Sequence, residues 1–192
     1  MAAPRRAWRP LYDAVLDLAA HRPVEEITAT EVALAAGVHR STFYEHATSP
    51  AELLRRALRE QLDDIRTQHL TAPPAHAGDA VVAVTLAVLA HVEDHGAIYE
   101  RALLSTGGGD LRAMLAEHFR DSMRTLEATG VVRPPFHAPG ASVRFHEEST
   151  ARFIANGVIG ILEAWLSEDP PREPAPFLAA LEGLATALHL GS

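Results

Sequence analysis

The chain has no cysteine in its 192 residues, which excludes disulfides, thiolate metal sites and cysteine nucleophiles. It also has no lysine, so arginine supplies all 17 of its cationic side chains. Arginine suits bidentate contacts to phosphate and guanine, but a GC-rich coding sequence would produce the same bias. The most apolar segments, residues 80–89 and 153–166, are shorter than the roughly 20 residues that span a bilayer. Because residues 1–13 lack the apolar core of a signal peptide, we expect a cytoplasmic location.

The negative charge is concentrated in the later part of the chain. The formal net charge is −8, which by itself disfavours binding to phosphate groups. Residues 1–70 hold 9 arginines and 10 acidic side chains, whereas residues 71–192 hold 8 arginines and 15 acidic side chains. The first third of the chain can therefore carry a local basic face although the whole protein is acidic.

Helical periodicity recurs along the chain and no segment has a convincing strand pattern, so we predict an all-α fold of about nine helices. The first helix should end before Pro23, because proline disfavours helical geometry in the residue before it. Ser49, Pro50 and Glu52 have the spacing of a capping box with proline in the first turn, which predicts a long helix to residue 70. The segment TAPPAHAGD (71–79) is the clearest break. Later helices are expected at residues 79–95, 97–105, 110–129, 144–167 and 175–190.

Two short helical segments joined by a glycine occupy residues 28–47, in the pattern of a helix-turn-helix. Thr28 or Thr30 can cap the first segment, and Gly37 supplies the left-handed turn that ends it. Val38 and Phe43 are expected to pack inward and hold the second segment. Its polar side chains would then face outward and could donate to phosphate oxygens and base edges, unless the helix is simply solvated. These side chains are His39, Arg40, Ser41, Thr42, Tyr44 and His46.

The stretch TATEVALAAGVHRSTFYEH resembles the DNA-binding head of the TetR family of transcriptional regulators, and the likeness extends over residues 8–62. The glycine, the Thr-Phe-Tyr core and His46 all fall in the family's register. The resemblance implies that the helix matching residues 38–46 lies in the major groove of DNA. It also implies backbone contacts from Thr30, Tyr44 and His46. Arg40, Ser41 and Thr42 would lie nearest to the bases.

Three positions depart from the family pattern. His39 stands where serine is usual, which alters the cap of the recognition helix. Ala47 replaces a large aromatic residue, and Pro50 replaces a frequent phosphate-contacting lysine. We expect weaker non-specific affinity for DNA, partly offset by N-terminal arginines that reach along the DNA backbone. These are Arg5, Arg6 and Arg9.

The last two predicted helices carry apolar stripes that suit pairing with a second copy of the chain. The segment FIANGVIGILEAWLSED also resembles the penultimate helix of one TetR subgroup, in which the last two helices of each subunit form a four-helix interface. The alternative is that the stripes face the chain's own core. The residues expected at a dimer interface are Ile154, Gly157, Val158, Ile161, Trp165, Phe177, Leu181, Leu184 and Leu188.

The middle helices, residues 79–129, are expected to bind an effector. Each candidate lining residue has ordinary core packing as its alternative: His95, Tyr99, Met114, His118, Phe119 and Met123. His91 and His95 have the i, i+4 spacing of two metal ligands, but the sequence fixes no third ligand. We therefore predict no metal and no cofactor.

These patterns favour a DNA-binding transcriptional regulator, most simply a homodimeric repressor that a small molecule releases from a pseudo-palindromic operator. The resemblance places a DNA-binding domain at residues 1–48, a connecting helix at 49–70, and an effector-binding and dimerisation domain at 71–192. A helical enzyme is disfavoured, because no Gly-x-Ser-x-Gly, His-Glu-x-x-His or P-loop spacing occurs. Ala47 and Pro50 keep open a protein-interaction module with a degenerate helix-turn-helix, and DNA binding would separate the two.

Overall fold

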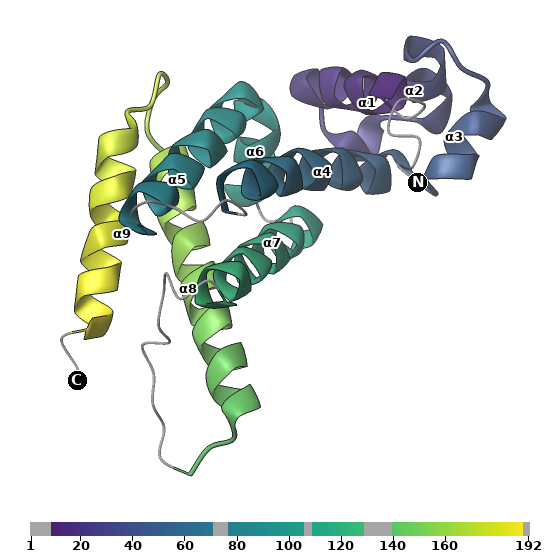
Figure 1. Ribbon diagram of the computed structural model, residues 1–192. Helices are drawn as coiled ribbons and strands as arrows, with labels where there is room; N and C mark the ends of the chain where they lie inside the picture. The colour runs from purple at the N-terminus through teal and green to yellow at the C-terminus, as the bar shows by residue number, and fades with distance from the viewer. Residues whose placement is uncertain (1–8, 71–76, 106–108, 129–139, 190–192) are drawn as a thin grey trace.

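The computed structural model describes residues 9–70, 77–105, 109–128 and 140–189 (Figure 1). These residues form nine α-helices, one short 3-10 helix and no strand, so the predicted all-α fold is confirmed. The bounds of the last five helices differ from the predicted ones by at most two residues. The elements are α1 (Arg9–His21), η1 (Val24–Glu26), α2 (Ala29–Ala35), α3 (Arg40–His46), α4 (Pro50–Leu70), α5 (Ala77–Asp94), α6 (Gly96–Leu103), α7 (Gly109–Ala128), α8 (Val143–Leu166) and α9 (Pro174–His189).

The helices form two groups that meet on α4 (Figure 1). The head consists of α1, α2 and α3, with α1 packed against the N-terminal part of α4. The body consists of the described parts of α5 to α9. There α5 and α7 pack against α4, α8 packs along α7, and α9 lies beside α8 and α5. The helix α3 and the α8–α9 pair therefore lie at opposite ends of the molecule (Figure 1).

One continuous cluster of buried apolar side chains runs from the head through α4 into the body. Burying each leucine side chain contributes about 2 kcal/mol of hydrophobic free energy. The spacing of three or four residues along α4 places its buried side chains on one helical face. The regions 1–48, 49–70 and 71–192 expected from the sequence thus share one core in their described parts. The buried residues of this face are Leu53, Leu54, Ala57, Leu58 and Leu62.

Local hydrogen bonds set the ends of the two short head helices. Thr28, rather than Thr30, caps α2: its hydroxyl accepts from the Glu31 N–H at 3.2 Å, and the Glu31 carboxylate accepts from the Thr28 N–H at 2.8 Å. Arg22 also donates to Glu31 at 2.6 Å, and these hydrogen bonds lower the pKa of Glu31 to about 2. Gly37 has φ +67, the left-handed conformation that ends α2 and turns the chain into α3.

The start of α4 differs in one detail from the predicted capping box. The Ser49 hydroxyl accepts from the Glu52 N–H at 3.2 Å, as expected for an N-cap. The Glu52 carboxylate, however, accepts the backbone N–H and the hydroxyl of Thr48, at 2.8 and 2.5 Å, instead of reaching Ser49. The acidic side chain therefore ties the α3–α4 connection to the first turn of α4, which fixes the angle between the two helices.

A buried arginine holds the connection between α8 and α9 against the rest of the body. The Arg172 side chain is 3% exposed and pairs with Glu93 of α5 at 2.9 Å and Glu100 of α6 at 2.6 Å. It also donates to the Leu166 carbonyl at 3.1 Å, and its guanidinium lies 5.6 Å from the centre of the Trp165 ring. Breaking a pair at such a buried site would leave an uncompensated charge. Arg172 thus fixes where α9 begins relative to α5 and α6.

In the described part of the chain, no single helix combines the length and the apolar composition needed to cross a membrane. The pair α5–α6 meets that test only when its two helices are taken together, and they bend by 91° where they meet.

The left-handed turn at Gly37 yields a first prediction. A Cβ at this position would meet no atom within 4 Å, so the cost of Gly37→Ala is conformational alone. We expect Gly37→Ala to lower the free energy of unfolding by about 1 kcal/mol, measured by urea denaturation. Gly109→Ala is the matched control, because Gly109 has equal space and no positive φ; it should change stability by less than about 0.5 kcal/mol. Equal effects of the two substitutions would contradict this account.

Candidate DNA-binding helix and ligand cavity

The helix α3 exposes most of the polar side chains that the sequence predicts to face outward, whereas Thr42 and His46 are half-buried. Phe43 is fully buried and anchors α3 in the core, so the opposite face of the helix is turned to solvent. Tyr44 is 50% exposed, and Arg40 and Ser41 are also exposed, whereas Thr42 is half-buried. This arrangement leaves a short helix with donors and acceptors available along one side.

The N-terminus of α3 has no side-chain cap. His39 is the N-cap residue, and its side chain makes no capping hydrogen bond, in line with its departure from the usual serine. Without a cap, the first N–H groups of α3 stay available to an anion such as a phosphate oxygen.

The arginine of α3 is already oriented. The Arg40 guanidinium donates to the Tyr44 hydroxyl at 3.0 Å and lies 5.3 Å from the centre of the Tyr44 ring. A stacked guanidinium loses less conformational entropy on binding than a free one does. Arg40 and Tyr44 therefore form one exposed cationic and hydrogen-bonding unit on α3.

The other predicted DNA-contacting residues that the structure describes lie on α1, α2 and the end of α3. Thr30 is exposed on α2, and His46 is half-buried at the end of α3. Arg9 is exposed at the start of α1, whereas Arg5 and Arg6 lie outside the described residues. Ala47 is 4% exposed and packs in the core directly after α3, and Pro50 is the first residue of α4.

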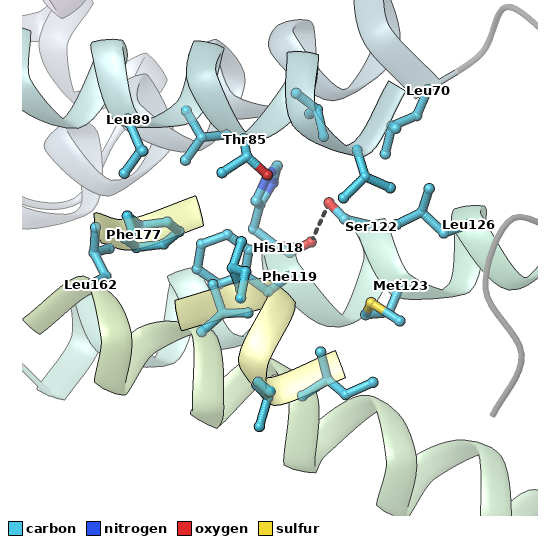
Figure 2. A pocket seen from close by; sticks show the side chains of 17 residues that line it. Leu70, Thr85, Leu89, His118, Phe119, Ser122, Met123, Leu126, Leu162 and Phe177 are labelled. Carbon is cyan, nitrogen blue, oxygen red and sulfur yellow. Dashed lines mark hydrogen bonds between the residues drawn. The ribbon is translucent and has the colours of Figure 1, made fainter. Parts of the chain in front are cut away.

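The body contains a mainly apolar cavity of about 220 Å³ between α5, α7, α8 and α9 (Figure 2). Leu70, the last residue of α4, also lines it. Its polar lining residues are Thr85, His118 and Ser122, and no charged side chain lines it within the described part of the chain. Figure 2 shows these polar side chains midway along the cavity, with Leu89 and Phe177 toward one end and Met123 and Leu126 toward the other. The cavity can thus hold an apolar molecule and offer it a few polar contacts.

Three of the six predicted effector residues line this cavity: His118, Phe119 and Met123. The other three lie elsewhere because they have partners in the core. Tyr99 is fully buried and its hydroxyl is 2.9 Å from Nε2 of His91. His95 pairs through Nε2 with Oε1 of Gln61 at 3.0 Å, and Met114 is 3% exposed among core side chains.

Burial keeps several histidines of the body neutral. Burial, together with smaller contributions from the neighbouring His95 and from His118, lowers the pKa of His91 to about 3. Burial likewise lowers the pKa of His95. The rings of His91 and His95 lie 4.8 Å apart, so protonating one would disfavour protonating the other. In the described residues, no group of three or more His, Asp or Glu side chains could hold a metal ion.

The apolar stripes predicted for a dimer interface largely pack inside the chain. Five of their members line the cavity: Ile154, Val158, Phe177, Leu181 and Leu184. Gly157 serves this internal packing, because a Cβ there would lie 3.2 Å from the Leu184 side chain, and Trp165 is 6% exposed. A second hollow of about 510 Å³, at the connection between α8 and α9, is bordered by Ile161, Trp165 and Phe177. The side chain of Leu188 lies outside the described residues.

Small side chains are exposed along one side of α8. They recur every four residues, at Asn156, Gly160 and Ala164, which places them on one side of the helix. On α9 the exposed small residues include Ala179, Ala180 and Gly183. Large apolar side chains of α8, Phe145 and Phe153, are exposed as well.

Two features of the site were not predicted. One face of α5 lines the cavity with Val81, Val84 and Val88. The sequence does carry a signal for this, because α5 is apolar on all sides and such helices are usually buried on more than one face. Arg101 of α6 donates to the carbonyls of Ala19 and Ala20, the latter at 2.9 Å, at the end of α1. The sequence gives no sign of this contact, since it joins residues about eighty positions apart.

Comparison with solved structures identifies the class of fold. The chain is similar to FadR of Thermus thermophilus, a TetR-family repressor solved with lauroyl-CoA, with a TM-score of 0.61 and 20% identity over 94% of this chain and 92% of that one. It is similar to SmeT, the repressor of a Stenotrophomonas maltophilia multidrug efflux pump, with a TM-score of 0.60 and 16% identity over 95% and 90% of the two chains. It is also similar to the Bacillus subtilis regulator FadR, solved with stearoyl-CoA. That comparison has a TM-score of 0.60 and 15% identity, over 92% of this chain and 97% of that one. No protein-family model matches the chain, and no curated protein matches it in sequence. The protein therefore has a TetR-like fold.

The buried histidines generate a prediction about pH. An unfolded histidine takes up a proton near pH 6.5, whereas folded His91 does so only near pH 3. Between these values the unfolded state binds more protons, so stability must rise with pH. We expect the titration of His91 to lower the free energy of unfolding by about 2 kcal/mol at pH 5 relative to pH 7.5.

Urea denaturation at the two pH values measures this effect. His91→Gln can still hydrogen-bond to Tyr99 but cannot titrate, so its stability should depend less on pH. His21→Gln, at an exposed histidine of α1, is the matched control and should keep the wild-type dependence. An unchanged dependence in His91→Gln would show that His91 is not the titrating group.

Proposed function

We propose that the protein is a homodimeric transcriptional repressor whose affinity for DNA falls when a small molecule occupies the cavity. The observation that carries this proposal is the position of α4. Its first two turns are bonded to the α3–α4 connection and to the end of α3, and its last residue lines the cavity. The TetR-like fold supports it, as do the structural neighbours, which include repressors and acyl-CoA complexes.

In this proposal α3 lies in the major groove of the operator. Arg40 donates to guanine O6 and N7, the commonest bidentate base contact of arginine, and Ser41 and Thr42 contact neighbouring base edges. Thr30, Tyr44 and His46 hold the DNA backbone, with His39 at the uncapped start of α3. Arg5 and Arg6 add contacts to phosphate that carry no sequence information.

Two contacts would transmit the state of the cavity to the head. Arg56 of α4 donates to the His46 carbonyl at the end of α3 at 2.6 Å, so a tilt of α4 moves α3 with it. Arg101 of α6 holds the last carbonyls of α1, which ties the other side of the head to the body. A ligand lowers DNA affinity only if it binds more tightly to the arrangement that cannot reach both half-sites.

The exposed face of α8 and α9 is the proposed dimer interface. Small side chains at Gly160 and Ala164 allow helices of two copies to approach closely, and the hollow at the α8–α9 connection, beside Ile161, can receive side chains of the partner. The α8–α9 pair lies at the end of the molecule opposite α3 (Figure 1). A two-fold dimer would thus hold its two heads apart, as operators with half-sites about 34 Å apart require.

The test of DNA binding uses fragments from beside the protein's own coding region, titrated by fluorescence anisotropy at several salt concentrations. We expect a discrete nanomolar complex whose affinity falls steeply with salt. Arg40→Ala should weaken specific binding by roughly 10- to 100-fold and relax the sequence preference. Arg144→Ala removes an equally exposed arginine at the distant start of α8 and should leave both properties unchanged.

Weak binding that ignores sequence would contradict the repressor proposal. It would favour a protein-interaction module, with Ala47 and Pro50 having removed contacts that DNA needs. An equal loss of affinity in Arg40→Ala and Arg144→Ala would show that α3 does not read the bases.

The dimer interface has a separate test. Ala164→Glu introduces two like charges across a symmetric interface and should convert the dimer to monomers in light scattering. Because a single head remains, affinity for the operator should fall by roughly 100-fold. Ala90→Glu adds the same charge on the exposed side of α5 and should stay dimeric. A monomeric wild type, or a dimeric Ala164→Glu, would contradict the proposed interface.

A further inference from the structure

The cavity has one buried polar side chain whose partner determines its chemistry. His118 is 2% exposed, and its Nδ1 lies 3.2 Å from Oδ1 of Asp63 on α4. The Asp63 carboxylate also pairs with Arg66 at 3.0 Å, and Arg59 lies 3.9 Å away, so it faces two guanidinium groups as well as the imidazole. An ionised carboxylate only accepts hydrogen bonds, and therefore Nδ1 of His118 must carry the proton.

The second ring nitrogen of His118 is then an acceptor. Burial lowers the pKa of His118, an effect that the hydrogen bond to Asp63 opposes, and the ring is neutral at pH 7. A neutral imidazole with its proton on Nδ1 has a lone pair on Nε2. His118 lines the cavity, and no hydrogen bond of Nε2 to another described residue is found. A molecule in the cavity can satisfy this acceptor with a hydroxyl or an N–H group.

The rest of the lining sets the charge and size of the occupant. Since no described lining residue is charged, a carboxylate or ammonium group would lose its water without gaining an ionic partner. A protein cavity of about 150 Å³ with apolar walls takes up benzene. At about 220 Å³, this cavity has room for a single ring with a short branched substituent.

We propose that the cavity takes a compact, uncharged, mainly apolar molecule with one hydroxyl or N–H group, which donates to Nε2 of His118. This deepens the proposed function, on which its regulatory role rests, by naming the class of effector. The proposed effector differs from lauroyl-CoA and stearoyl-CoA, with which two of the structural neighbours were solved, because an acyl-CoA carries phosphates and a long acyl chain. Because His118 is hydrogen-bonded to Asp63, the bound molecule would be connected to α4 through these two side chains.

Isothermal titration calorimetry of the wild-type chain at pH 7.5 tests this inference with four probes. The first is 4-tert-butylphenol, and in 4-tert-butylanisole, the second, a methyl group replaces the hydroxyl hydrogen, so the donor is lost. The third probe, 4-tert-butylbenzoate, carries a charge, and lauroyl-CoA is the fourth. We expect the phenol to bind about tenfold more tightly than the anisole, as one buried hydrogen bond provides. The benzoate and lauroyl-CoA should bind more weakly than the anisole.

Variants then locate the donor's partner. In His118→Phe the phenol and the anisole should bind equally, because the acceptor is gone while an aromatic ring remains. Ser122→Ala is the matched control, since it removes a different polar group of the lining and should keep the tenfold preference. The comparison of phenol with anisole on the wild type needs no variant, so a misfolded His118→Phe would not prevent the test.

Three results would overturn the inference: equal affinity of phenol and anisole, tighter binding of the benzoate or of lauroyl-CoA, or binding of none of the four. DNA binding by the same sample distinguishes this failure from failure of the proposed function. An operator complex without phenol binding would reject the class of effector and leave the repressor standing. Phenol binding with the tenfold preference, in a protein that binds no DNA, would support the ligand assignment and reject the repressor.

Discussion

One face of α4 is packed along its length, and the rest of the molecule is arranged around it. Leu53 and Leu54 bury their side chains near the head, and Leu58 and Leu62 continue the same face toward the body. A helix of 21 residues spans about 32 Å and cannot bend sharply without losing backbone hydrogen bonds. A displacement at one end of α4 is therefore passed to the other end, where the Arg56 contact and the Thr48–Glu52 bonds fix the connection to α3.

This constraint explains why the polar groups of the body matter. Asp63 and Gln61 face the body from α4, and they pair with His118 of α7 and His95 beside α6. A ligand in a purely apolar cavity would make no hydrogen bond connected to α4. Here the buried His118 of the cavity is hydrogen-bonded to Asp63 of α4, the helix against which the head packs. Arg172 supports the arrangement from the far side by fixing α9, which forms part of the cavity wall.

Local patterns in the sequence predict most of the fold, because caps and periodicity are encoded within a few residues. The left-handed turn at Gly37 and the capping of α4 by Ser49 are examples. The cavity was harder to predict, because its lining comes from four body helices and the end of α4, and the 3.6-residue period does not say which neighbour a face meets. Tyr99 illustrates this: its sequence context suits a cavity wall equally well, yet its partner His91 places it in the core. The stripes of α8 and α9 turned inward for the same reason.

The separation of the two heads in the proposed dimer is the most direct measure of transmission through α4. Since the chain has no cysteine, a spin label can be attached at Leu34→Cys alone, on a side chain of α2 that is 81% exposed. Pulsed electron resonance then measures the distance between the two labels in the free protein, on operator DNA and with 4-tert-butylphenol. The account predicts a defined distance on DNA and a shifted distance with the phenol. A distance that is the same in all three states, or the absence of any distance between labels, would contradict transmission through α4.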